Sequence, residues 1–457
     1  MSKLWAWVLG LVVLVAIGFL VACGSTYNSS HDGLVLITSQ GSALIETFSF
    51  SLQSGHAAAI QNSPNDTANK TCVLNAIPSS IVVDPAGAFA YTILTANTAC
   101  NTTNSTSMTG IATFKVNSDG TMTAVGQLTP LLSATVGICP GGPNSIPVQE
   151  SGVAVNPSRL VMDSAGKFLF VADNATVDSN GIPAPGAVTV FVIGSGGSLT
   201  EVAGSPFTVP ASCAAQPNNL GSLAVTPTVL PPSLFGQAQS VCSAPNTPPV
   251  SEYLYAADSV NNGVWEFTVN TSTGVLGNPP SSSSPQFFAT GSTPMGVAVD
   301  PCDRFVYVSN SISNNVSAYN ICTATSSATQ PQCPGDTGKL VPVSGSPFAV
   351  SNGAQGPGPL VVDPYGNYVY VLDTLSNTIS PFRISPVSGA LTIMNPATVA
   401  TGQGAKSIAI RSDDNWMFVT DYIAATVSQF AIAPATGALS PQAPITTDNY
   451  PWGVAVK

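Results

Sequence analysis

One pattern of apolar and polar positions recurs along the chain. A short alternating strand is followed by a tight turn, which begins with Asp and Pro or related residues and contains Gly, and then by a second strand that carries aromatic residues. Copies occur at Ile81–Tyr91, Leu160–Phe170, Leu223–Tyr255, Val297–Tyr307, Leu360–Tyr370 and Ile408–Phe418, the third of them stretched by a Pro-rich insertion. Asp and Pro initiate tight turns and Gly supplies a positive φ, so each copy predicts a β-hairpin.

A second element follows each hairpin: a strand such as Thr189–Val192, a turn that contains Gly, and a final strand. The turn glycines number seven: Gly55, Gly120, Gly197, Gly274, Gly338, Gly389 and Gly437. The two elements together give a unit of four antiparallel strands, which we name A to D. Four-stranded units repeated seven times predict an all-β fold, a single seven-bladed β-propeller.

The two ends of the chain explain how the ring closes. Leu34–Ile37 resembles a B strand with no A strand before it, and Trp452–Val456 resembles an A strand with nothing after it. Together they are expected to complete one blade, which removes the exposed strand edges of an open stack. We therefore expect residues 34–457 to form one propeller domain.

The first 23 residues differ from the rest. Lys3 precedes an uncharged apolar run from Leu4 to Val21, and the run ends in Leu-Val-Ala before Cys23. This resembles the lipobox of bacterial lipoproteins, in which the Cys is lipidated and the preceding peptide removed. It implies a signal peptide at residues 1–22, a lipidated Cys23 with a polar tether at 23–33, and an extracytoplasmic chain anchored to a membrane of the cell envelope. The alternative is an uncleaved transmembrane helix.

Composition agrees with an exported protein that does not bind nucleic acid. Charged residues make up only 7% of the chain, the formal net charge is -11, and no basic run occurs. Binding to nucleic acid needs clustered Lys and Arg. The eight cysteines beyond Cys23 are an even number, so disulfides are expected, and the absence of a Cys-x-x-Cys spacing argues against zinc.

Propeller topology sorts these cysteines, because D–A and B–C loops share one face and A–B and C–D loops share the other. The pairs that it makes reachable are Cys72–Cys100, Cys139–Cys213, Cys242–Cys302 and Cys322–Cys333. Eight cysteines allow 105 connectivities, so other pairings remain open.

Residues just before the A strands should form a channel mouth on the D–A face. Most are small and neutral, and the candidates for ligand binding among them are Ser80, Arg159, Lys406 and Trp452. Two cations and an indole suit an anionic or sugar-like ligand. In the alternative interpretation the two cations are solvated and Trp452 packs in the closing blade.

The B strands end in a second polar set. Its members are Asp173, Asp258, Asn310, Asp373 and Asp421. Carboxylates that converge near a channel can hold Ca²⁺, but such residues more often cap a turn through their own side chains. We expect turn caps, and no metal or other cofactor.

Two segments resemble a known propeller repeat. Val306–Asn310 followed by Asn315–Ser317, and Val369–Asp373 followed by Asn377–Ile379, look like the YVTN repeat. With the Asp-Pro-x-Gly turns, they resemble the seven-bladed lactonase family, which includes propeller-type 6-phosphogluconolactonases. The resemblance implies lactone hydrolysis by His and Arg placed before A strands. Here the corresponding pairs are Ser158-Arg159 and Lys406-Ser407, and no catalytic residue is assigned because neither histidine, His31 or His56, precedes an A strand.

Two functions remain open. The first is an anchored, monomeric propeller that binds an unidentified protein, glycan or small molecule, or forms part of the envelope. The alternative is a lactonase-like hydrolase of sugar lactones outside the cytoplasm. The missing histidine favours the first, because lactone hydrolysis needs a base to activate water.

Overall fold

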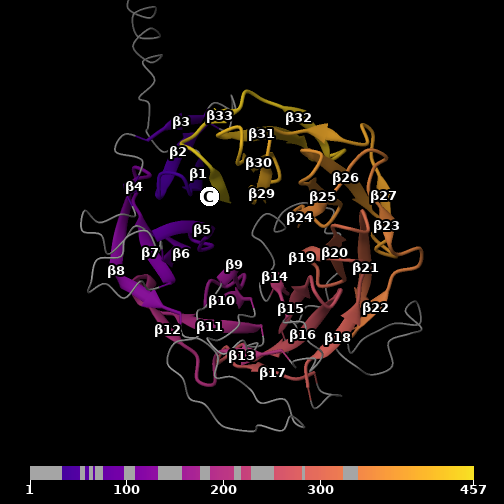
Figure 1. The fold of residues 1–457 in the computed structure, drawn as a ribbon, viewed down its shortest axis with the longest axis horizontal. Coiled ribbons are helices and arrows are strands. Elements are labelled where there is room, and N and C mark those ends of the chain that lie inside the picture. Colours follow the sequence, from indigo (N-terminus) through magenta and orange to yellow (C-terminus); the bar gives the residue numbers. More distant parts are fainter. Residues whose placement is uncertain are drawn as a thin grey trace, which may run out of the picture.

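The computed structural model describes residues 33–51, 57–60, 65–66, 76–96, 109–131, 157–174, 186–209, 218–227, 252–279, 284–322 and 338–457. These residues form seven antiparallel sheets arranged around a common axis (Figure 1). We number the sheets as blades 1 to 7. This confirms the predicted seven-bladed, all-β propeller.

Blades 1 to 4 contain the following strands, given from the axis outward. Blade 1 comprises β34 (Pro451–Val456), β1 (Gly33–Ser39), β2 (Leu44–Phe50), β3 (Ala57–Ala59) and β4 (Asn65–Asp66). Blade 2 comprises β5 (Ala76–Val83), β6 (Phe89–Ala96), β7 (Gly110–Val116) and β8 (Met122–Pro130). Blade 3 comprises β9 (Pro157–Met162), β10 (Phe168–Asp173), β11 (Ala187–Ile193), β12 (Leu199–Glu201) and β13 (Phe207–Thr208). Blade 4 comprises β14 (Leu220–Val225), β15 (Glu252–Asp258), β16 (Gly263–Val269), β17 (Leu276–Gly277) and β18 (Gln286–Ala289).

Blades 5 to 7 repeat the arrangement. Blade 5 comprises β19 (Pro294–Val299), β20 (Phe305–Asn310), β21 (Asn315–Ile321), β22 (Leu340–Pro342) and β23 (Phe348–Ala349). Blade 6 comprises β24 (Pro357–Val362), β25 (Tyr368–Asp373), β26 (Thr378–Ile384), β27 (Leu391–Ile393) and β28 (Val399–Ala400). Blade 7 comprises β29 (Ala405–Ile410), β30 (Trp416–Asp421), β31 (Thr426–Ala433), β32 (Ala438–Pro441) and β33 (Ile445–Thr446). In six blades the outer D strand is split into two short pieces that both pair with strand C. A single 3₁₀ turn, Ser195–Gly197, is the helical element of the described residues.

Blade 1 closes the ring with strands from both ends of the described chain. Strand β1 pairs antiparallel with β34, with Val35 opposite Val456 and Ile37 opposite Val454. Figure 1 shows the indigo β1 beside the yellow C-terminal strand. The predicted closure is therefore confirmed.

A recurrent Asp at the start of the A–B turn holds the hairpin together in blades 2, 3, 5 and 6. The Oδ1 atom of Asp363 accepts the backbone N–H groups of Asn367 and Tyr368, both at 2.6 Å. The equivalent aspartates, Asp84, Asp163 and Asp300, make the same pair of bonds. One side chain thus satisfies two donors that the tight turn leaves free.

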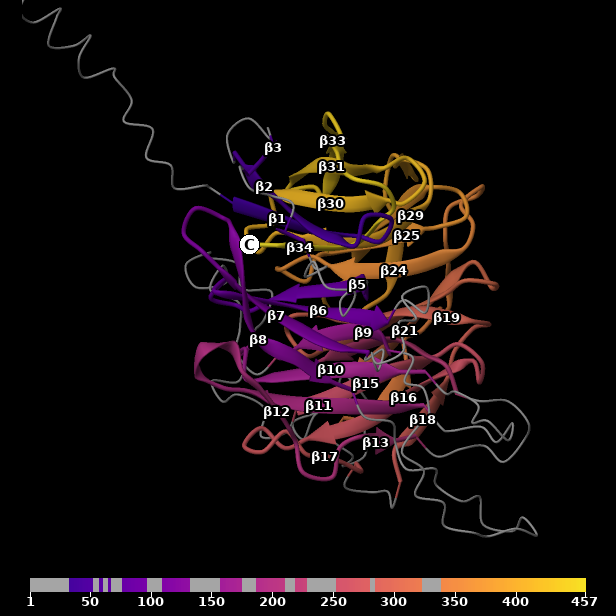
Figure 2. The same cartoon turned by 60° about the vertical axis from the view of Figure 1, so that its left-hand side comes forward.

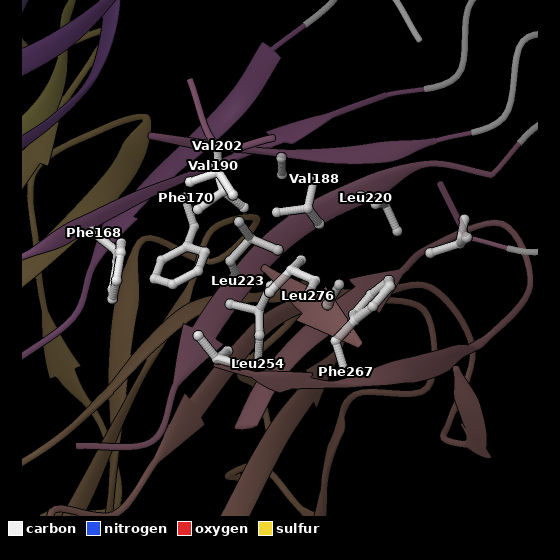
Figure 3. Packing of buried hydrophobic residues seen from close by; sticks show 14 residues of the cluster. Phe168, Phe170, Val188, Val190, Val202, Leu220, Leu223, Leu254, Phe267 and Leu276 are labelled. Atoms are coloured by element: carbon white, nitrogen blue, oxygen red, sulfur yellow. The ribbon is translucent and has the colours of Figure 1, made fainter. Parts of the chain in front are cut away.

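The core lies between blades. One cluster of buried residues joins blade 3 to blade 4, where Phe168, Phe170 and Val190 face Leu223, Leu254 and Phe267 (Figure 3). Similar clusters fill the other interfaces. Within the described residues no helix is long and apolar enough to cross a membrane.

Candidate functional site

The inner strands share an irregularity at the end where they begin. In β29, Lys406 is an extra residue between the pairs Ala405–Asp421 and Ser407–Thr420. In β34, Trp452 is the extra residue in the same place. The other five inner strands shift register at the equivalent position. Bulges re-aim side chains, so this end of the ring, which we call the mouth, presents residues that a regular strand would not.

Hydroxyl groups connect the mouth ends of neighbouring inner strands. The Ser80 Oγ accepts the backbone N–H of Leu160 in the next blade at 3.1 Å. The Ser222 Oγ accepts that of Val297 at 3.3 Å in the same way. Ser80 is thus already engaged in a contact between blades 2 and 3, and its burial separates it from the more open candidates.

Arg159 follows the bulge of β9 and is partly buried. Burial lowers the pKa of its guanidinium. No hydrogen bond or ion pair engages this guanidinium within the part of the chain that the structure describes. Cations at the opposite end of the ring differ: Arg304 pairs with Asp300 and Arg411 with Asp413, each at 2.7 Å. Arg159 therefore keeps its donors available, which is the arrangement that anion recognition needs.

Lys406 and Trp452 come from neighbouring blades, 7 and 1, and the structure brings them together. The Lys406 Nζ lies 5.2 Å from the centre of the Trp452 ring and 5.7 Å from that of Tyr422. Tyr422 in turn lies 4.8 Å from Tyr450 and 5.6 Å from Trp452, measured between ring centres. Arg159 belongs to blade 3, three inner strands round the ring from the β29 strand that carries Lys406. The mouth therefore has two separate cationic points.

Tyr422 and Tyr450 were not among the candidates from the sequence. Tyr422 directly follows the Asp that ends β30, and Tyr450 precedes the first residue of β34. Propeller topology places B–C turns and D–A loops on one face, so this was the signal available to find them.

The polar residues at the B-strand ends bond within their own blades. Asp373 accepts hydrogen bonds from Ser380 (2.7 Å) and Thr378 (3.3 Å). Asp421 accepts equivalent bonds from Ser428 and Thr426. Asp258 accepts the N–H groups of its own turn, and Asn310 bonds to the following strand. Asp173 also takes part in an interaction with another residue. Nowhere in the described ranges do three or more His, Cys, Asp or Glu side chains form a metal-binding group.

Several predicted residues lie outside the described ranges. They are Cys23, His31, His56, Cys72, Cys100, Cys139, Cys213, Cys242 and Cys333. Cys302 and Cys322 are described, and both are disulfide-bonded. Because the expected partners Cys242 and Cys333 are among the undescribed residues, the four pairings stay predictions.

Comparison with known protein families and solved structures shows which proteins this chain resembles. Residues 337–452 match the family described as "Lactonase, 7-bladed beta-propeller". The chain is a seven-bladed β-propeller similar to the lactonase family. The match covers the end of blade 5, blades 6 and 7, and the start of β34, so it includes Lys406, Tyr422 and Tyr450 but not Arg159. No curated protein sequence matches this lactonase-like propeller.

Solved structures match it over nearly its whole length. A putative 6-phosphogluconolactonase from Bacteroides uniformis superposes with a TM-score of 0.64 at 16% identity, covering 93% of this chain and 99% of that one. A periplasmic gluconolactonase from Pseudomonas aeruginosa gives a TM-score of 0.62 at 16% identity, covering 93% and 98%. At such identities the likeness shows that the lactonase-like propeller shares their fold.

Proposed function

We propose that this lactonase-like propeller hydrolyses sugar lactones at its mouth. The observation that carries the proposal is the partly buried Arg159 guanidinium, which has no partner among the described residues of a chain with a net charge of -11. An unpaired cation is costly to desolvate, so its retention here suits a ligand that carries or develops negative charge. The family match and the names of the similar structures point to lactones as that ligand.

In lactone hydrolysis, water adds to the ring carbonyl and negative charge builds up on the carbonyl oxygen. The ring C–O bond then breaks, one proton of the water ends on the ring oxygen and the other is released to solvent, and the hydroxy acid leaves as its carboxylate. Arg159 is suited to donate hydrogen bonds to the developing oxyanion. Lys406 is suited to attract the anionic product. The described residues at the bulges and directly after them include no carboxylate and no imidazole, so the general base is not one of these.

Location outside the cytoplasm is part of the proposal. Cys302 and Cys322 are disulfide-bonded, which is typical of an oxidising compartment, and one similar structure is named a periplasmic gluconolactonase. If Cys23 anchors the chain, the position where β1 begins sets the orientation of the propeller relative to the membrane. Leu34 donates to Lys457 O at 3.3 Å, so β1 begins at the end of the ring opposite the mouth (Figure 2). The mouth would then face away from the membrane.

A second candidate is non-catalytic binding of the same ligands. It is supported by the lack of a base among the described bulge residues. The chain also has only two histidines, and neither directly precedes an A strand. Both candidates place the ligand at the mouth, and they differ only in turnover.

A pH-stat assay of the full chain with D-glucono-1,5-lactone tests the proposal. We expect acid release above the spontaneous rate, and Arg159→Met should lower kcat/KM about 100-fold because an oxyanion donor is lost. Arg383→Met, at an exposed position of β26, is the matched control and should change nothing. Binding of gluconate without turnover would select the second candidate, and neither binding nor turnover would overturn both.

A further inference from the structure

The mouth contains an aromatic cluster that the proposed chemistry at Arg159 does not use. It consists of Tyr422 from the B–C turn of blade 7, Tyr450 from the loop before β34, and Trp452 from the bulge of β34. Tyr450 is 47% exposed, a high value for an aromatic residue. Tyr422 and Tyr450 have ring planes only 30° apart, whereas Trp452 meets Tyr422 edge-on at 82°. Three separate segments therefore place aromatic rings together at the ligand face.

The backbone under Tyr450 is held in a costly conformation. Tyr450 has a φ of 63°, in the left-handed region that side-chain-bearing residues rarely adopt. The turn after β1 fixes it, because Gln40 N–H donates to Tyr450 O at 3.0 Å and Gly41 N–H donates to Asn449 O at 3.1 Å. The same conformation occurs directly before the inner strands of blades 5, 6 and 7, at Thr293, Gly356 and Gly404, so it is a feature of the repeat that fixes the backbone at Tyr450.

A buried carboxylate anchors the same loop. Glu46, in β2, accepts the Asp448 N–H at 2.9 and 3.1 Å through its two oxygens, and also accepts the Ser39 hydroxyl at 2.8 Å. The backbone beside the other two rings is also bonded. Thr420 Oγ1 donates to Trp452 O at 2.8 Å, and Tyr422 N–H donates to Gly404 O at 3.0 Å. The segments that carry the cluster are therefore fixed before any ligand arrives.

The charge in this cluster is positive. Within the described residues, Lys406 forms no hydrogen bond or ion pair, and its ammonium group lies by the Trp452 and Tyr422 rings instead. Cation–π contacts hold the ammonium without neutralising it. Aromatic rings offer rigid apolar area with polar edges, which suits the C–H face of a sugar ring.

From this geometry we infer a binding subsite for a sugar ring that bears a carboxylate, such as a uronic acid, with its C–H face against the aromatic rings and its carboxylate at Lys406. The inference rests on the proposed function only in taking the mouth as the ligand face, and it requires no hydrolysis. It deepens that function by assigning an acidic sugar unit to the side of the mouth opposite Arg159.

Isothermal titration calorimetry of the full chain with methyl β-D-glucuronide tests the subsite. We expect saturable binding that Lys406→Met and Tyr450→Ala each weaken at least tenfold, since one removes a charge-assisted bond and the other the stacking surface. Methyl β-D-glucoside should bind at least tenfold more weakly than the glucuronide. The matched controls are Lys115→Met, on the exposed side of β7, and Tyr365→Ala, in the A–B turn of blade 6 at the other end of the ring.

Three results would overturn the subsite: no saturable binding, affinity unchanged in both variants, or acetate binding as tightly as the glucuronide. The outcome is separate from that for lactone hydrolysis. Arg159→Met should lower kcat/KM about 100-fold and leave glucuronide affinity unchanged. A wild-type chain that hydrolyses no lactone but still binds glucuronide through Lys406 and Tyr450 would refute hydrolysis while supporting the subsite.

Discussion

At the scale of single residues, the recurrent C–D glycines explain how one blade recognises the next. A Cβ on Gly389 would lie 2.4 Å from the Phe305 ring of the preceding blade, and the residue has a φ of 73°. The Tyr307 hydroxyl of that blade also donates to Gly389 O at 3.0 Å. Gly197, Gly274, Gly338 and Gly437 meet aromatic rings of preceding blades in the same way. The glycine motif and the aromatic B strand are therefore two halves of one contact between blades.

Substituting Gly389 should expose both costs of this contact. Gly389→Ala forces a side chain into the left-handed region and into the Phe305 ring, and we expect a loss of about 3 kcal/mol of unfolding free energy in urea titrations. Gly196→Ala is the matched control, because Gly196 has a φ of 79° but open space around its Cβ position. It should lose only about 1–2 kcal/mol. Equal losses in the two variants would show that ring packing contributes nothing.

At the scale of elements, the hairpins were predictable because their determinants are local. The A–B turn begins with Asp in blades 2, 3, 5 and 6 and has a residue with positive φ near its end, and both features can be read from the sequence. Where Gly is absent the structure places Asp303 and Asp414 in the left-handed region, with φ of 54° and 57°. The stretched copy in blade 4 was also recognised, because β14 and β15 keep their apolar alternation on either side of the insertion.

The composition of the mouth was only partly predictable. Lys406 and Trp452 were identified because they precede apolar strands, but the bulges that present them leave no mark in the alternation of apolar residues. Tyr422 belongs to the turn after β30, and Tyr450 belongs to a loop that is distant from Lys406 in the chain. Only the assembled ring shows that these residues meet. The bonds of the Ser80 hydroxyl across blades likewise depend on how neighbouring inner strands are placed.

At the scale of the whole molecule, acidic groups gather at the end of the ring opposite the mouth. Glu252, at the start of β15, is 1% exposed, and neither of its carboxylate oxygens has a hydrogen-bond partner among the described residues. Burial, reinforced by neighbouring carboxylates, raises the pKa of Glu252, Asp303 and Asp414 to about 8. These groups hold protons in the folded state at pH values where the unfolded chain has lost them.

The stability of the propeller should therefore fall as pH rises from about 4 to about 8. In this window the folded state binds more protons than the unfolded state, and the free energy of unfolding then decreases with pH. We expect a Tm several degrees higher at pH 5 than at pH 8, and Glu252→Gln should reduce the difference by raising the Tm at pH 8. Asp119→Asn, in an exposed turn, is the control. A Tm that rises from pH 5 to pH 8 would contradict this assignment.

The central claim is that the mouth is the ligand site, and the most direct test is a crystal structure of the chain with a sugar lactam that cannot be hydrolysed. The account predicts the lactam at the mouth, with its carbonyl oxygen within hydrogen-bonding distance of the Arg159 guanidinium. A lactam bound at the opposite end of the ring, or bound at the mouth without contact to Arg159, would contradict it.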